Sequence, residues 1–354
     1  MEKESLDFLT QLIGAISPSG YEQRAAKLWQ TRTALCGASV KTDVHGNSIA
    51  CLGTKETPRI MLAGHIDEIG YMIKYIDKEG FLYFAPVGGI DPQLMPGQRV
   101  WVQGKKDRVL GLIGKKPIHQ LDESERKKVV KVDQLWIDIG VRNEEEAREL
   151  VSVGDVAVPA VGLEETRNRR YVGRGFDDRA GAFTVSETLK ALAASPPPAS
   201  VFGVATVQEE IGIRGARTSA YGIDPHVGIC VEVTFASDSP GMNKRKEGDV
   251  RLDAGPVLGR GPNINPKVFE TLVRAAEEYG IPYQIEAQPR ATGTDANVMQ
   301  LTRAGVATGL VSIPLRYMHT PVELLSLNDV QNTVKLLEKG VKALAEVPSF
   351  LPSI

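Results

Sequence analysis

The chain lacks the features typical of membrane, nucleic-acid-binding and disulfide-stabilised proteins. Its 354 residues carry 42 Lys and Arg against 44 Asp and Glu, so no excess of positive charge favours a nucleic acid or an anionic membrane surface as partner. The three cysteines, Cys36, Cys51 and Cys230, lie far apart in apolar segments, which predicts buried thiols in a reducing compartment. No apolar run reaches the ~20 residues that cross a bilayer, and no apolar leader follows Met1. We expect a cytoplasmic globular enzyme acting on peptides or other small molecules.

Helical and strand patterns alternate in the first and last parts of the chain. Apolar spacing predicts a helix over 6–16, and Ser19-Gly20-Tyr21-Glu22 has the pattern of a capping box for a second helix. The alternation predicts an α/β sandwich, in which ligands bind beyond the carboxyl ends of the strands. Strands are predicted over 47–52, 59–63, 201–207, 227–233 and 307–313, and further helices over 179–194, 266–280, 296–303 and 329–346.

The stretch 71–163 has a different texture. Short alternating runs are separated by Gly-rich or charged turns, which predicts a small all-β module. Asn143, followed by three glutamates, is the expected N-cap of one short helix inside it. Because the α/β alternation resumes afterwards, we expect an insertion into a discontinuous main domain made of residues 1–70 and 164–354.

Two adjacent carboxylates, Glu209 and Glu210, close the apolar run over 201–207. Burying both charges without a cation would raise at least one pKa strongly, so a bound metal, a proton transfer or both are indicated. Two imidazoles and three carboxylates suit Zn²⁺, Co²⁺ or Mn²⁺, and hold two ions if one carboxylate bridges them. These five candidates, expected just after strands or at loop ends, are His65, Asp177, Glu210, Glu232 and His319.

Each of these residues also has a structural interpretation. The pair Asp177-Asp178 before a helix is commonly an N-cap. Glu232 could be a sheet residue facing polar neighbours, and His319 could be an ordinary loop histidine. Asp67 lies two residues after His65 on the same side of an extended chain, so it can accept a hydrogen bond from the ring nitrogen that does not hold a metal.

Five motifs, in order along nearly the whole chain, resemble the tetrahedral (TET-type) metallo-aminopeptidases of the glutamyl aminopeptidase family. Members of this family have often been labelled endoglucanase or cellulase M. The five motifs occur together, which makes the resemblance far more specific than any one of them. They are Gly64-His65-Ile66-Asp67-Glu68-Ile69-Gly70, Phe176-Asp177-Asp178-Arg179-Ala180-Gly181, Gln208-Glu209-Glu210-Ile211-Gly212, Gly293-Thr294-Asp295-Ala296-Asn297 and Ser312-Ile313-Pro314-Leu315-Arg316-Tyr317-Met318-His319-Thr320-Pro321.

The resemblance implies a fold, a reaction and an assembly. The fold is a three-layer zinc-exopeptidase-like (phosphorylase/hydrolase-like) α/β sandwich with an inserted small β-barrel for dimerisation, and the dimers assemble into a dodecamer. The enzyme is an aminopeptidase with two divalent ions per subunit, Zn²⁺ or Co²⁺ in the first place and Mn²⁺ as an alternative. Asp177 bridges the ions through a residue pair joined by a cis peptide bond. Glu209 is the general base and Asp67 orients His65, while the ligands are His65, Asp177, Glu210, Glu232 and His319.

One position departs from the family pattern. The family usually has Val-Asp-Val-Thr-His where this chain has Val231-Glu232-Val233-Thr234-Phe235. Glutamate can still ligate, and in the wider superfamily it is associated with some carboxypeptidases. A carboxypeptidase or N-acyl amino acid deacylase is therefore one alternative, and a glycoside hydrolase or a metal-free structural protein are two others.

Overall fold

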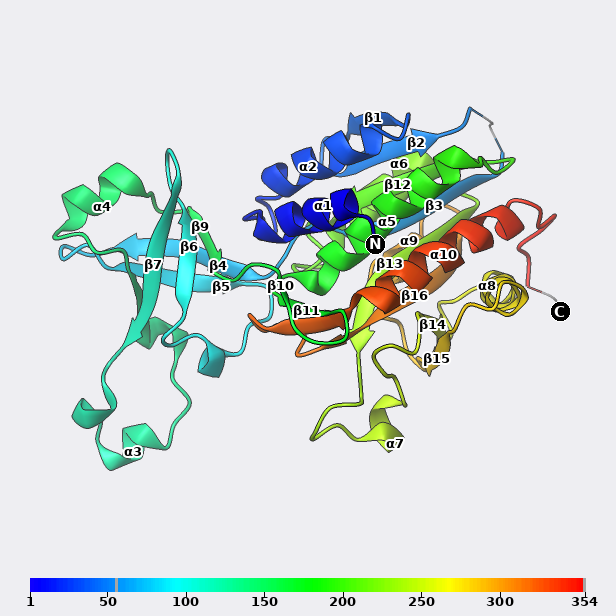
Figure 1. The fold of residues 1–354 in the computed structure, drawn as a ribbon. Coiled ribbons are helices and arrows are strands. Elements are labelled where there is room, and N and C mark those ends of the chain that lie inside the picture. The colour runs from blue at the N-terminus through cyan, green and yellow to red at the C-terminus, as the bar shows by residue number, and fades with distance from the viewer. Residues whose placement is uncertain (55–56, 353–354) are drawn as a thin grey trace.

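A mixed sheet of eleven strands forms the larger part of the molecule, with helices on both faces and a closed β-barrel beyond one end (Figure 1). The computed structural model describes residues 1–54 and 57–352. The strand order is β1-β2-β12-β3-β13-β16-β17-β11-β10, with β14 on β16 and β15 on β14. The strands are β1 Ser39–Thr42, β2 Ser48–Leu52, β3 Arg59–His65, β10 Glu164–Glu165, β11 Arg170–Gly173, β12 Ser200–Thr206, β13 Val227–Phe235, β14 Val257–Arg260, β15 Gln284–Ala287, β16 Ala307–Arg316 and β17 Glu323–Ser326.

The four central strands β12, β3, β13 and β16 run parallel to one another. In their register Thr206 lies beside His65, and Cys230 lies beside Ala63. The carboxyl ends of these strands therefore meet at a single edge of the sheet, where an open α/β sheet binds its ligands.

Alternation along the strands divides the buried side chains between two helical layers. On β3, Ile60 and Leu62 join the large core, whereas Met61 and Ala63 join a smaller core on the opposite face. This confirms the three-layer α/β sandwich. The large core is covered by α1 Lys3–Gly14, α2 Gln23–Ala34, α5 Phe176–Ala194, α8 Pro266–Glu278 and α10 Leu327–Leu344, and the smaller core by α6 Arg214–Ile223 and α9 Ala296–Met299, while α7 Lys244–Glu247 lies in the chain between β13 and β14.

The predicted β module is a closed six-stranded barrel in the order β4-β5-β8-β7-β6-β9. It has its own apolar core, which includes Ile73, Phe84 and Val100. Asn143 caps α4, as expected, by accepting from the Glu146 N–H. The division of the chain into domains at 70/71 and 163/164 stays a prediction. The elements here are β4 Gly70–Ile76, β5 Leu82–Val87, β6 Arg99–Gln103, β7 Arg108–Lys115, α3 Glu123–Arg126, β8 Leu135–Asp138, α4 Glu144–Leu150 and β9 Val156–Pro159.

Three local predictions were wrong. The capping box at Ser19 does not form, because the Ser19 hydroxyl donates to Asp67 and α2 starts only after Glu22. The helix predicted over 296–303 ends at Met299. Of the three cysteines, all free thiols, only Cys230 is buried, because the other two lie beyond the end of α2 and towards the end of β2.

Among the residues that the structure describes, no helix combines the length and the apolar character needed to cross a membrane.

Candidate metal centre

The carboxyl edge of the central sheet brings the five predicted ligands together. His65 is the last residue of β3, Asp177 lies in the first turn of α5, and His319 lies in the loop between β16 and β17. Glu210 follows β12, and Glu232 is on β13. Glu232 lies near the end of the strand predicted over 227–233, three residues before the last residue of β13.

Strand register explains how an interior residue reaches the site. Cys230 pairs with Ala63, so Glu232 and His65 each lie two residues further along neighbouring parallel strands. Side chains two apart on a strand share a face, which puts both on the side of the sheet that carries Met61 and Cys230. Glu232 Oε1 lies 3.6 Å from His65 Nε2.

Asp177 lies between the two imidazoles. Its Oδ1 is 3.1 Å from His65 Nε2, and its Oδ2 is 3.2 Å from His319 Nε2. On the far side, Glu210 Oε2 lies 3.5 Å from His319 Nε2. The site thus has two halves that share one carboxylate, with His65 and Glu232 in the first half and His319 and Glu210 in the second.

The other ring nitrogen of each histidine faces an acceptor. His65 Nδ1 lies 3.2 Å from the Asp67 carbonyl oxygen and 3.4 Å from its Oδ1. His319 Nδ1 lies 2.8 Å from the carbonyl oxygen of Gly89, which follows β5 of the barrel. Such contacts fix a ring so that Nε2 faces the site. Asp67 lies where the orienting role requires it, and the role itself stays a prediction.

Asp178 differs from Asp177 in what its carboxylate contacts. The two are joined by a cis peptide bond, as the resemblance implies. The Asp178 carboxylate accepts hydrogen bonds from the backbone amides of His65, at 3.1 Å, and Gly181, at 3.0 Å. It therefore ties α5 to the end of β3, although it also belongs to a possible cation-binding group with His65 and Glu232.

The loop after β12 turns the two adjacent glutamates towards different halves of the site. Gln208 has a left-handed φ of 57°, which bends the chain as it leaves the sheet. Glu209 Oε2 then lies 3.9 Å from His65 Nε2, whereas Glu210 faces His319. Asp67 holds this arrangement, because its Oδ1 accepts from Glu209 N and its Oδ2 from Glu210 N.

The charges at the site are unbalanced without a cation. Burial raises the pKa of both Glu209 and Glu210 to about 8, and nearby carboxylates add to it. Burial acts to raise the pKa of Asp177 too, but hydrogen bonds from His319 and His65 hold it below its usual value. The hydrogen bond to Asp177 raises the pKa of His319 to about 9.

The donor set fits divalent cations. His65, Asp177 and Glu210 offer ligand atoms within 4.8 Å of one another, and so do His65, Asp178 and Glu232. Among the described residues, the buried Glu210 Oε1 has no hydrogen-bond partner. Imidazole and carboxylate ligands without thiolate suit Zn²⁺, Co²⁺ and Mn²⁺.

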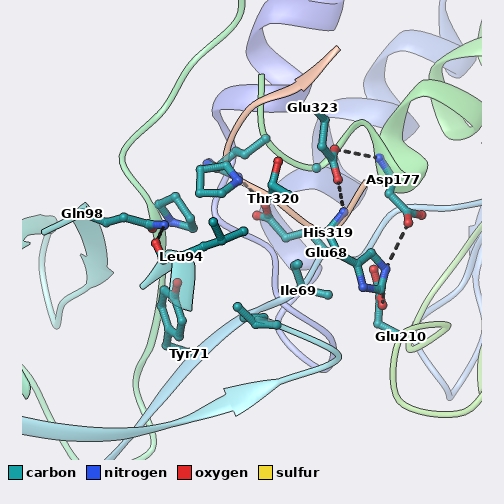
Figure 2. Close-up of a pocket in the computed structure, with 15 residues that line it drawn as sticks. Glu68, Ile69, Tyr71, Leu94, Gln98, Asp177, Glu210, His319, Thr320 and Glu323 are labelled. Carbon is teal, nitrogen blue, oxygen red and sulfur yellow. Dashed lines mark hydrogen bonds and ion pairs between the residues drawn. The ribbon is translucent and has the colours of Figure 1, made fainter. Parts of the chain in front are cut away.

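Sequence reasoning missed Glu323, the first residue of β17. Its Oε1 accepts from the His319 backbone N–H at 3.0 Å, and its Oε2 accepts from the Asp177 N–H at 3.2 Å (Figure 2). It therefore fixes the backbones of two candidate ligands at once. No motif pointed to it, because it lies four residues beyond His319 and reaches Asp177 only through the fold.

A recess opens beside the second half of the site, between the sheet and the barrel (Figure 2). Asp177, Glu210 and His319 form one wall. The remaining wall includes the apolar residues Ile69, Tyr71, Ile90, Leu94 and Pro321, with Gln98 as a polar residue on the barrel side. It also includes three charged residues, Glu68 and Arg174, which are paired with each other, and Glu323. A mostly apolar recess with a few converging polar groups is the usual form of a small-molecule site.

Residues 46–336 match the M42 glutamyl aminopeptidase family. The lysyl aminopeptidase of Pyrococcus furiosus is 40% identical over 87% of this chain and 86% of its own. A TET aminopeptidase structure from a marine-sediment Thaumarchaeota archaeon superposes with a TM-score of 0.91 at 36% identity, over 96% of each chain. A Pyrococcus horikoshii TET1 peptidase structure gives 0.85 at 35% identity, over 97% of this chain and 100% of that one. The chain therefore belongs to the M42 glutamyl aminopeptidase family, whose members are metal-dependent aminopeptidases.

Proposed function

We propose that this enzyme removes N-terminal residues from peptides with two divalent ions per subunit and with Glu209 as general base. The observation that carries the proposal is the Asp177 carboxylate, which presents one oxygen to each imidazole. The ligands would be His65, Asp177 and Glu232 in one half and His319, Asp177 and Glu210 in the other. Zn²⁺ or Co²⁺ fits this set first, with Mn²⁺ as an alternative.

The residues divide the chemical work. Two bound ions would supply an activated water, charge stabilisation at the carbonyl oxygen and a ligand position for the substrate's free amine. Glu209 accepts the proton of the attacking water through its carboxylate and then delivers it to the leaving amine. Asp67 fixes the backbone of Glu209 and faces His65 Nδ1, so one carboxylate orients both the base and a ligand.

The apolar recess beside Asp177, Glu210 and His319 is the place for the first side chain of the peptide. Ile69, Tyr71, Ile90 and Leu94 would contact the apolar part of that side chain. The positive charge of a free amine at the substrate's end would be attracted by the acidic side chains of the site, which are Asp177, Glu209, Glu210 and Glu232. A blocked amine carries no charge and loses that attraction. The proposed enzyme is for this reason an exopeptidase.

Paired substrates test the polarity of the reaction. We expect amino-acid p-nitroanilides to be hydrolysed at least about 100-fold more efficiently than their N-acetyl counterparts, because a site built to bind a polar group rejects the analogue that lacks it. The measurement is kcat/KM on both series with Zn²⁺, Co²⁺ and Mn²⁺ added back to the apo-protein. Release of acetate from the N-acetyl series without p-nitroaniline would support the deacylase alternative instead, and hydrolysis of N-blocked peptides that have a free carboxyl end would support the carboxypeptidase alternative.

Glu232→Asp tests the departure from the family pattern. Shortening the side chain by one methylene withdraws the carboxylate from His65, so we expect affinity for one of the two ions to fall by about 10- to 100-fold, the range found when metal-site support is lost. Calorimetric metal titration measures it, and Glu232→Gln, which keeps length but loses charge, is the matched variant. The preference for free amines should not change. A gain of activity on N-blocked substrates in Glu232→Asp would instead show that this residue sets the polarity.

A glycoside hydrolase is not favoured by this geometry. Its two carboxyl groups must flank the bond at about 5 to 9.5 Å. Glu209 and Glu210 are adjacent in sequence and face different imidazoles, which gives them no reason to flank a sugar. The two imidazoles that contact Asp177 have no part in such a mechanism.

We also propose that the barrel carries the dimer contact and that dimers assemble into a dodecamer. A related TET1 structure is described as a dodecamer, and the P. horikoshii TET1 peptidase as a tetrahedron or octahedral shell. In this chain Leu110, Leu112, Ile118 and Val129 of the barrel are about half exposed. Light scattering of the purified protein measures the assembly mass. A monomeric mass would exclude both the dimer and the dodecamer.

A further inference from the structure

The loop that carries Glu209 and Glu210 is fastened by side chains from outside the central strands. Four consecutive backbone amides, from Val207 to Glu210, each donate to a side-chain oxygen from a distant part of the chain. The acceptors are Asn47 Oδ1 for Val207, Glu22 Oε1 for Gln208, and the two Asp67 carboxylate oxygens for Glu209 and Glu210. The position of the proposed base therefore depends on three side chains that lie elsewhere in the sequence.

Glu22 is the acceptor at the bend itself. Its Oε1 accepts from Gln208 N at 3.2 Å and from Gly20 N at 2.6 Å. Glu22 is only 5% exposed. Burial raises the pKa of its carboxyl to about 7, and the charge of Asp67 adds to this effect. Glu22 contacts no candidate ligand through any hydrogen bond described, so its hydrogen bonds reach the site through the loop, and its charge acts on Asp67.

The segment around Glu22 is firmly attached to the chain that carries Asp67. Ser19 N donates to the Glu68 carbonyl oxygen at 3.2 Å, and the Ser19 hydroxyl donates to Asp67 Oδ2 at 2.6 Å. Glu68 N in turn donates to the Ser17 carbonyl oxygen at 3.1 Å. Glu22 and Asp67 thus belong to one hydrogen-bonded unit, which supports three successive amides of the catalytic loop.

We propose that Glu22 is a positioning residue for the general base, an inference that rests on the proposed role of Glu209. Gln208 has a left-handed φ of 57°, which a residue with a side chain adopts only when its surroundings require it. The bond from Gln208 N to Glu22 supplies that requirement. Without the acceptor, the half-buried amide loses its partner and Gln208 returns to an ordinary conformation, which rotates the Glu209 carboxylate away from the attacking water.

The test compares three variants of Glu22 in the metal-loaded enzyme on an amino-acid p-nitroanilide. Glu22→Leu fills the space without an acceptor, Glu22→Gln keeps one acceptor oxygen, and Glu22→Asp keeps the carboxylate but is too short to reach both amides. We expect kcat of Glu22→Leu to fall by about 10- to 100-fold, the range caused by a misplacement of about 1 Å. KM should stay within about threefold, because substrate binding does not use the base. Glu22→Gln should keep most of the wild-type kcat.

Two further measurements separate positioning from loss of stability. Hydrogen exchange should accelerate in the peptide that contains 207–212 in Glu22→Leu and Glu22→Asp, but not in Glu22→Gln. Asp329 is the matched control, because it is a buried carboxylate that also accepts two backbone amides, those of Asp253 and Gly255. Asp329→Leu should lower the melting temperature without changing kcat. If Glu22→Leu does not fold, Glu22→Asp carries the same prediction.

The outcomes distinguish the inference from its premise. Wild-type kcat in Glu22→Leu, or an equal loss of kcat in Asp329→Leu, would overturn the inference while an inactive Glu209→Gln leaves the base assignment intact. An active Glu209→Gln enzyme would instead overturn the base assignment itself. Loss of bound metal in Glu22→Leu in proportion to its activity would show that the loop displacement acts on the ligand Glu210 and not on the base, and would contradict the proposed role.

Discussion

Replacing Glu209 by glutamine is expected to give a folded, metal-loaded and nearly inactive enzyme. The amide keeps the shape of the side chain but cannot accept the proton of the attacking water. General acid–base catalysis contributes about 10²- to 10⁴-fold, so kcat should fall by about that factor. KM and metal content should change little, because Glu209 is not one of the five proposed ligands.

Glu210→Gln is the matched control for this variant. It makes the same chemical change one residue away, but its Oε2 faces His319 in the second half of the site. It should therefore lose bound metal first and activity as a consequence. Steady-state kinetics and metal analysis on both proteins measure the contrast. Substantial turnover by Glu209→Gln at full metal occupancy would exclude Glu209 as the base.

Much of this site could be predicted because its residues lie next to regular structure. A buried apolar strand that gives way to charge is visible in the sequence, and three of the candidates, His65, Glu210 and Glu232, lie on or close behind predicted parallel strands. Parallel strands bring their carboxyl ends to one edge, so placing the strands also placed these residues near one another. The sequence alone gave little reason to choose His319 over an ordinary loop histidine. Only the motif around it supported its assignment as a ligand.

The supporting residues could not be found in the same way. Glu323 and Glu22 each accept two backbone amides. A backbone amide has no sequence signature, and one of the two that each residue holds lies more than a hundred positions away, so no spacing connects donor and acceptor. Ser19 and Glu22 did form a recognisable pattern, the capping box, but tertiary structure used both side chains differently: Ser19 binds Asp67, and Glu22 holds the bend at Gln208.

The barrel adds a second contact that sequence could not show. The carbonyl oxygen of Gly89, in the stretch that follows β5, lies 2.8 Å from His319 Nδ1, although the two residues are 230 positions apart. The barrel therefore takes part in the geometry of the site, besides any role in assembly.

Removing the metal is expected to abolish activity reversibly, for two physical reasons. The first is the loss of the activated water and of charge stabilisation, which are worth several kcal/mol and hence about 1,000-fold or more in rate. The second concerns the base itself. In the ion-free site the pKa of Glu209 is about 8, so at pH 7 most of that carboxyl is protonated and cannot accept a proton. Nearby cations would lower that pKa and so keep Glu209 ionised.

Chelation followed by metal addition tests this directly. Dialysis against a chelator should reduce turnover to the background rate, and Zn²⁺, Co²⁺ or Mn²⁺ should restore it as occupancy approaches two ions per chain. Asp177→Asn sharpens the result, because this carboxylate faces both imidazoles and its loss should weaken both ions together, whereas Glu232→Gln should weaken only one. Full activity in protein shown to be metal-free would refute the metal centre. One ion per chain at full activity would refute the two-ion site and the shared role of Asp177, and would leave a single-ion centre in one half of the site.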